Sequence, residues 1–315
     1  MNLSFVIVIE TTEEFLNMTE LLLFSFRKNA GIYKNCEITL VTMGNSLEKK
    51  KIYELSDKFG PLIVKTMPRL GGIPYNNKFN FLYAVDPENT DIIVYLDYDL
   101  VILEPLDEIT DAFVMDDAHI KALPINPSGC KAAGNYEKLI LEYCYNTKNT
   151  LSSFKNDQFI SLYPLFNTGL ILMNSKAVIS MREDILNFSY RLYSSKLKST
   201  IPGGYYLNLI FNTVRDYLKG VSTSYKLWNT EQMAFALAMI NNNVGYSTFD
   251  KKYICSIGRK NRPVVILHFT NLKKIIDLKY LFNGDWQKEF LKSQNPLKSS
   301  LAKLVDSYNK EYGHK

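Results

Sequence analysis

The sequence contains little cysteine and little histidine. Its 315 residues include 4 Cys and 3 His, and no two cysteines have the C-x-x-C spacing of zinc and redox motifs. So few scattered thiols favour a reduced, intracellular environment. A zinc site built from clustered histidines is excluded as well. Any metal site in this chain must therefore rest mainly on oxygen ligands.

Long hydrophobic runs are also absent. No stretch approaches the roughly 18 continuous apolar residues of a membrane-spanning helix. The first residues, MNLSFVIVIETTEEF, lack the basic start and the small-residue cleavage site of a signal peptide. We therefore expect a cytoplasmic protein without a transmembrane anchor. The 37 basic and 32 acidic residues give a net charge of +5, too little to indicate nucleic acid as a partner.

The entry motifs of several enzyme classes are missing. The sequence has no G-x-G-x-x-G after its first predicted strand, no Walker phosphate loop, no H-E-x-x-H and no G-x-S-x-G. These absences argue against nicotinamide redox chemistry, P-loop hydrolysis and serine hydrolysis.

The sequence does contain enough apolar material for a folded core, with 46% hydrophobic and 22% charged residues. Short apolar runs of β type alternate with segments of helical spacing. This alternation predicts an α/β fold with a mainly parallel sheet flanked by helices. The predicted strands are Leu3–Ile9, Glu37–Thr42, Leu62–Thr66, Asp91–Asp97, Phe166–Met173 and Val264–Phe269. Helices are predicted near Lys78–Ala84, Met181–Leu192, Leu207–Leu218 and Met233–Ile240.

The sharpest local feature is a pair of carboxylates at the end of an apolar strand. Ile92–Leu96 runs directly into Asp97-Tyr98-Asp99, and the next segment, Leu100–Leu106, is apolar again. Ligands of open α/β sheets bind beyond the carboxyl ends of the strands, and residues i and i+2 of a strand share one face. The two carboxylates therefore predict a site for a hard cation, Mn²⁺ or Mg²⁺. The alternative is that both acids only end the strand and begin a turn.

This pattern resembles the Asp-x-Asp element of nucleotide-sugar glycosyltransferases with the GT-A fold. Further segments resemble motifs of glycosyltransferase family 8 and follow in the order of that family. They are Asn77-Lys78-Phe79, the FNTG segment that begins at Phe166, Glu231-Gln232 and His268-Phe269. The resemblance covers roughly residues 1–275.

The resemblance implies a GT-A, Rossmann-like domain at residues 1–275, with a nucleotide-binding half at 1–110 and an acceptor-binding half at 111–275. It implies transfer of a sugar from a nucleotide diphosphate sugar, a UDP-sugar in that family, to a hydroxyl of a carbohydrate or glycoconjugate acceptor, with a retaining outcome. It also implies that Asp97, Asp99 and His268 hold Mn²⁺ or Mg²⁺. Without the resemblance, a lone strand histidine is more often a core residue than a ligand.

Several residues are candidates for binding the donor. Lys78 and Lys274 would supply positive charge for the diphosphate, and the Asn167 amide would offer donors and an acceptor to sugar hydroxyls. Alternatively, Lys78 is a solvated lysine at a helix start and Asn167 only marks the start of a strand. The full set of candidates is Thr11, Thr12, Lys78, Asp97, Tyr98, Asp99, Asn167, Gly169 and Lys274, with the two threonines at the nucleoside end.

Glu231 and Gln232 are the expected catalytic residues. A carboxylate near the anomeric carbon could act as a base for the acceptor hydroxyl or stabilise positive charge on the sugar. The alternative is an ordinary helix start, in which Gln232 is the capping partner of Asn229 and Glu231 is a first-turn acid. Trp228, directly upstream, is the candidate platform for an acceptor sugar.

Residues 276–315 are predicted to form a basic helical extension. From Trp286 to the end, 6 lysines face 3 acidic residues, with apolar residues interspersed. Such a tail could make peripheral contact with a membrane surface. The alternative is a terminal helix that packs on the body of the protein.

Two other functions stay open at this point. A sugar nucleotidyltransferase also places paired carboxylates and a metal on an α/β sheet, but Glu10–Phe15 lacks the Gly-rich basic loop that such enzymes carry after the first strand. A non-catalytic protein that binds nucleotide sugars or carbohydrates would keep the fold for recognition alone.

Overall fold

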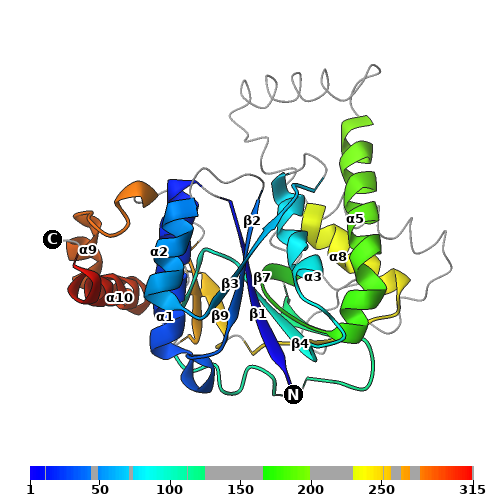
Figure 1. Cartoon of the computed structure of the whole chain (residues 1–315), viewed down its shortest axis with the longest axis horizontal. Helices are drawn as coiled ribbons and strands as arrows, with labels where there is room; N and C mark the ends of the chain where they lie inside the picture. Colours follow the sequence, from blue (N-terminus) through cyan, green and yellow to red (C-terminus); the bar gives the residue numbers. More distant parts are fainter. Residues whose placement is uncertain are drawn as a thin grey trace.

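The computed structural model describes residues 1–10, 12–43, 49–70, 74–111, 113–124, 166–198, 230–250, 252–256, 264–269 and 277–313. These residues form a central sheet with helices on both of its faces (Figure 1). No helix in these ranges has the length and the apolar character needed to cross a membrane.

The central sheet has seven strands in the order β3-β2-β1-β4-β7-β6-β8. Its first part is parallel: β1 (Leu3–Ile9) pairs with β2 (Ile38–Met43) and with β4 (Ile92–Leu96), and β2 pairs with β3 (Leu62–Met67). β2 and β4 are buried along their whole length because helices cover both faces, which explains the unbroken apolar sequence of β4 and the mainly apolar sequence of β2. The four strands confirm the predicted ones, with ends that differ by at most one residue.

The rest of the sheet is mixed. β7 (Phe166–Asn174) runs antiparallel to β4 and to β6 (His119–Pro124), and β8 (Gly245–Thr248) pairs with β6 in parallel. One mixed, mainly parallel sheet thus takes strands from both sides of residue 110, as the predicted fold class requires. The pairing of β6 with β7 shifts register between Ala122 and Leu123, so β7 bulges near the carboxyl end of β4.

Alternate residues of the strands face two separate cores. Phe5 and Ile7 pack on the side of α1 and α2, whereas Val6 and Val8 pack on the side of α3, α5 and α8 (Figure 1). The helices are α1 (Glu13–Asn29), α2 (Lys49–Phe59), α3 (Phe81–Ala84), α5 (Ser175–Lys198) and α8 (Thr230–Asn241). α5 and α8 contain the helices predicted at Met181–Leu192 and Met233–Ile240, and the one predicted at Leu207–Leu218 lies outside the described residues.

Two predicted elements differ from the structure. The helix expected near Lys78–Ala84 is a 3-10 helix, η2 (Pro74–Asn80), followed by the short α3. The strand expected at Val264–Phe269 is only β10 (Ile266–His268) and lies outside the central sheet. It forms a second sheet with β5 (Leu100–Ile102), to which it is antiparallel, and with β9 (Ile254–Ser256), to which it is parallel. This second sheet thus joins two strands from the later part of the chain, β9 and β10, to the segment that follows Asp99.

The C-terminal helices pack against α1. In the described part of the chain, the remaining helices are η1 (Gly31–Tyr33), η6 (Leu278–Tyr280), α9 (Trp286–Leu291) and α10 (Pro296–Tyr312). Leu301 and Tyr308 of α10 are fully buried in the core that contains α1. The Tyr308 hydroxyl donates to Glu20 of α1, which also accepts from Lys58 at 2.7 Å. The apolar side of the tail is thus used inside the protein, as in the packed alternative, while several of its lysines stay exposed.

We predict that α10 contributes to the stability of the whole domain. Leu301→Ala removes a fully buried side chain and leaves a cavity, which should lower the free energy of unfolding by about 2–5 kcal/mol. Leu291→Ala is the matched control, because Leu291 is 43% exposed, and it should change that free energy by less than about 0.5 kcal/mol. Urea unfolding followed by circular dichroism measures both, and equal effects would contradict the docking of α10.

Candidate active site

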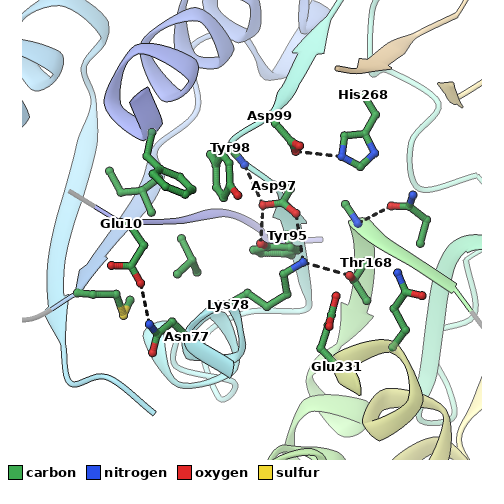
Figure 2. A pocket seen from close by; sticks show the side chains of 17 residues that line it. Glu10, Asn77, Lys78, Tyr95, Asp97, Tyr98, Asp99, Thr168, Glu231 and His268 are labelled. Carbon is green, nitrogen blue, oxygen red and sulfur yellow. Dashed lines mark hydrogen bonds and ion pairs between the residues drawn. The ribbon is translucent and has the colours of Figure 1, made fainter. Parts of the chain in front are cut away.

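All but one of the predicted site residues that the structure describes gather at one cavity. It has a volume of about 210 Å³ and lies at the carboxyl ends of β1 and β4, beside the bulged end of β7 (Figure 2). Nine of the predicted residues line it: Lys78, Asp97, Tyr98, Asp99, Asn167, Gly169, Glu231, Gln232 and His268. Thr12 is exposed at the N-cap of α1 and does not line this cavity, while Thr11, Trp228 and Lys274 lie outside the described residues.

Asp97 follows β4 directly and is held on both carboxylate oxygens. Its Oδ1 accepts from the Tyr95 hydroxyl at 3.3 Å and from the backbone N–H of Tyr98 at 3.2 Å. Its Oδ2 accepts from the Lys78 ammonium at 3.2 Å. The backbone N–H of Asp97 donates to the Gly169 carbonyl at 2.8 Å, so the turn stays attached to β7. Asp97 is only 8% exposed, which is unusual for a residue that merely ends a strand.

Asp99 pairs with His268. The Nε2 of His268 lies 3.0 Å from Oδ1 of Asp99, and both residues are nearly buried. The pairing of β10 with β5 produces this contact, because His268 stands opposite Leu100, the residue after Asp99. The backbone N–H of Phe269 also donates to the Asp99 carbonyl at 3.0 Å. A strand from the far end of the chain thus brings an imidazole to the carboxylate pair.

Lys78 is a partly buried cation among carboxylates, with 18% of its side chain exposed. Besides Asp97, its ammonium donates to the Thr168 hydroxyl at 3.1 Å (Figure 2). Burial alone would lower the pKa of Lys78, but the charges of Asp97 and Glu231 outweigh it and raise that pKa. Lys78 is therefore a permanent positive charge of the site and not a solvated lysine at a helix start.

The bulge in β7 depends on Asn167 and Gly169. The side-chain Oδ1 of Asn167 accepts from the Gly169 N–H at 2.7 Å, which closes a local turn. A Cβ atom at Gly169 would lie 2.8 Å from that oxygen and 3.2 Å from Cε1 of His268. A side chain at this position would therefore press on the Asn167 amide oxygen and crowd the imidazole. Asn167 uses its acceptor for the backbone, which leaves its amide N–H groups to act as donors.

Glu231 and Gln232 lie in the first turn of α8 and are both buried. Figure 2 shows the Glu231 carboxylate on the same side of the cavity as Lys78. The Oε1 of Gln232 is buried and has no hydrogen-bond partner among the described residues. A buried acceptor without a partner at the wall of a cavity suits a ligand hydroxyl or N–H. Asn229, the capping partner in the alternative interpretation, lies outside the described residues.

Some residues that line the cavity were not predicted from the sequence. Glu10 follows β1 directly and accepts from Asn77 at 2.7 Å and from both terminal nitrogens of Arg69. Its place after a strand that ends at Ile9 could have indicated it. Tyr95 could have been inferred as well, because it precedes Asp97 by two residues and so shares its face.

The cavity offers atoms of the kind that bind a hard divalent cation. Asp97 and Asp99 offer carboxylate oxygens, and His268 offers an imidazole nitrogen. In the described part of the chain, no three His, Cys, Asp or Glu side chains are grouped as a ready-made metal site. Instead, Asp97 pairs with Lys78 and Asp99 pairs with His268. A divalent cation would therefore have to compete with two ion pairs.

The two carboxylates differ in acidity. Burial raises the pKa of Asp97, and Lys78 offsets only part of this effect. Burial would also raise the pKa of Asp99, but the charge and the hydrogen bond of His268 outweigh it and lower that pKa. The same pair acts on the imidazole: burial would lower the pKa of His268, but Asp99 outweighs it and raises that pKa above 6.5. The Asp99–His268 pair is thus ionic between these two pKa values.

Solved glycosyltransferases share this architecture. Mouse xyloside xylosyltransferase 1 in its apo form superposes with a TM-score of 0.51 at 13% identity, over 86% of this chain and 98% of that one. An active-site mutant of LgtC gives 0.51 at 13% identity, over 96% and 95% of the two chains. Apo GlyE from Streptococcus pneumoniae gives 0.51 at 12% identity, over 99% of this chain and 64% of that one. The chain has the GT-A fold. No protein-family model and no curated protein sequence matches it.

We predict that the pKa of His268 in the metal-free protein lies above its ordinary value of 6.5. The stability contributed by the Asp99–His268 pair should be complete from just below pH 6.5 down to the range where Asp99 takes up a proton, and should be lost as the pH rises through the raised pKa of His268. Asp99→Asn should lower that pKa. His119, whose pKa is lowered by burial, is the internal control and should not respond. Titration of the imidazole signals by NMR measures both, and a His268 midpoint at or below 6.5 would contradict the ion pair.

Proposed function

We propose that the chain is a metal-dependent glycosyltransferase that moves a sugar from a nucleotide diphosphate sugar, a UDP-sugar, to a hydroxyl of a glycan. The observation that carries this proposal is the buried Asp97–Asp99 pair with its cationic partners at the carboxyl edge of a GT-A sheet. The fold supports glycosyl transfer, since solved proteins that share it are named xylosyltransferase and glycosyltransferase. The motif resemblance supports UDP and a retaining outcome.

Asp97, Asp99 and His268 would hold Mn²⁺ or Mg²⁺ in this proposal. The cation, when bound, neutralises negative charge on the leaving diphosphate and so assists cleavage of its bond to the sugar. One carboxylate oxygen of Asp97 is already directed by the Tyr95 hydroxyl, and the backbone of Asp99 is held by the N–H of Phe269. Such preorganisation lowers the cost of arranging ligands when the cation and the donor bind.

Three residues of the chain would act on the sugar and the phosphates. Lys78 keeps a positive charge beside the place where negative charge develops. Glu231 would stabilise positive charge at the anomeric carbon when the bond to the diphosphate oxygen breaks and the bond to the acceptor oxygen forms, while the proton of the acceptor hydroxyl passes to the leaving diphosphate. Gln232 would accept a hydrogen bond from a substrate hydroxyl through its buried Oε1.

We predict that the protein releases nucleotide from a UDP-sugar only in the presence of a divalent cation. A panel of UDP- and GDP-sugars with Mn²⁺ should identify the donor, and EDTA should abolish the release. Asp97→Asn and Asp99→Asn should each lower the rate by at least about a hundredfold, because each removes a charged ligand without changing the shape of the side chain. Asp306→Asn, on the distant α10, is the matched control and should act like wild type.

The outcomes separate the alternatives. Metal-dependent binding of UDP without any release, with all acceptors tested, would favour a non-catalytic binding protein. Formation of a nucleotide sugar from a nucleoside triphosphate and a sugar phosphate would favour a nucleotidyltransferase. No metal-dependent binding of a nucleotide would reduce Asp97 and Asp99 to a strand-ending turn and remove the proposal.

We also predict that Glu231→Gln lowers the turnover of the donor on the order of a hundredfold while the product anomer stays the same. The amide keeps the size of the side chain but removes the charge that would stabilise the sugar. Glu183→Gln, on the exposed side of α5, is the matched control. Near-complete activity of Glu231→Gln would show that this carboxylate neither stabilises charge nor acts as a base.

A further inference from the structure

Lys78 is the residue at which separate elements of the site meet. It comes from η2 and contacts Asp97 after β4 and Thr168 on β7, and its charge interacts with Glu231 of α8 (Figure 2). The position of this one ammonium therefore affects the position of charge throughout the cavity. Among the described residues, only Asp97 and Thr168 accept hydrogen bonds from it.

These two acceptors differ in kind. Asp97 is a carboxylate that the proposed cation would also bind, so its contact with Lys78 is open to competition. The Thr168 hydroxyl is neutral and 3.1 Å from the ammonium, and Thr168 is buried. A neutral acceptor offers no charge to a divalent cation, so this contact can persist when Asp97 changes its partner. Thr168 is thus the partner that can keep Lys78 in place during the reaction.

Thr168 lies within the bulge of β7. In a regular strand, residues two apart share a face, so Phe166 would join Leu170 and Leu172 in the core on the α1 side. Instead, Phe166 packs with Ile171 and Met173 in the opposite core. One reversal of the alternation therefore lies between residues 166 and 170, where the pairing with β6 shifts register.

We propose that Thr168 is a positioning residue that acts through Lys78. Its hydroxyl holds the ammonium between Asp97 and Glu231, so that the cationic charge stays beside the leaving diphosphate and away from Asp99 and His268. This inference rests on the proposed function, because it assigns a further residue to the same reaction. It predicts that the hydroxyl of Thr168 matters, and that the shape of its side chain does not.

Two substitutions separate the hydroxyl from the shape. Thr168→Val keeps the branched shape and removes the hydroxyl, and should lower kcat for the UDP-sugar about tenfold with a smaller change in KM. Thr168→Ser keeps the hydroxyl and should restore most of this loss. Thr90→Val, which removes the hydroxyl of a buried threonine that bonds Ser4, should leave kcat unchanged. A Thr168→Ser variant as slow as Thr168→Val, or slower, would overturn the proposal.

A double-mutant cycle tests whether Thr168 acts through Lys78. Thr168→Val should lower the melting temperature of the wild type, but should have little further effect in a Lys78→Met background. Equal effects in both backgrounds would overturn the proposal. The melting temperature requires no donor, so a wild type without turnover would end the proposed function while this cycle still decides the role of Thr168. If Lys78→Met does not fold, the melting temperatures of the Val and Ser variants decide it, and Thr168→Val must be the lower.

Discussion

The burial of negative charge at the end of β4 is the constraint on which the rest of the site depends. Asp97 is 8% exposed and Asp99 only 4%, and Glu231 is buried near them. An ionised carboxylate removed from water is costly unless it is paired and hydrogen-bonded. The chain meets this requirement with two cationic groups, Lys78 and His268, each of which contacts one aspartate. The cavity is thus an assembly of ion pairs before any ligand enters it.

This requirement explains why segments far apart in the sequence converge here. Lys78 arrives from the 3-10 helix before β4, and His268 arrives on β10, whose antiparallel pairing with β5 sets its height beside Asp99. The bulge in β7 completes the arrangement, because Gly169 makes room for the imidazole and Thr168 meets the ammonium. Each of these features is a small departure from regular secondary structure, and each lies at the edge of the sheet where ligands bind.

The local patterns were predictable from the sequence, and the long-range ones were not. The parallel strands and the Asp97-Tyr98-Asp99 turn followed from apolar runs and from the place of acids within them. The second sheet did not, because a three-residue strand such as β10 has no periodicity that assigns it to a sheet. The bulge could not be predicted either. It is recognised by a reversal in which residues face which core, and the two cores are known only from the packing. Lys78 was recognised as a candidate, but its partner Thr168 was not.

The C-terminal extension belongs to the same physical argument. After His268, the chain returns to α1, where the Asn17 amide donates to the Leu278 carbonyl at 3.2 Å and accepts from Lys51 at 2.9 Å. β10 and α10 share one apolar core with α1, so the strand that carries the imidazole and the terminal helix are buried together. An ion pair as weakly exposed as Asp99–His268 needs a rigid support, because its geometry determines whether the attraction between the two charges offsets the cost of removing them from water. Residues 277–312 contribute side chains to the core that α1 and β10 share, and so supply part of that support.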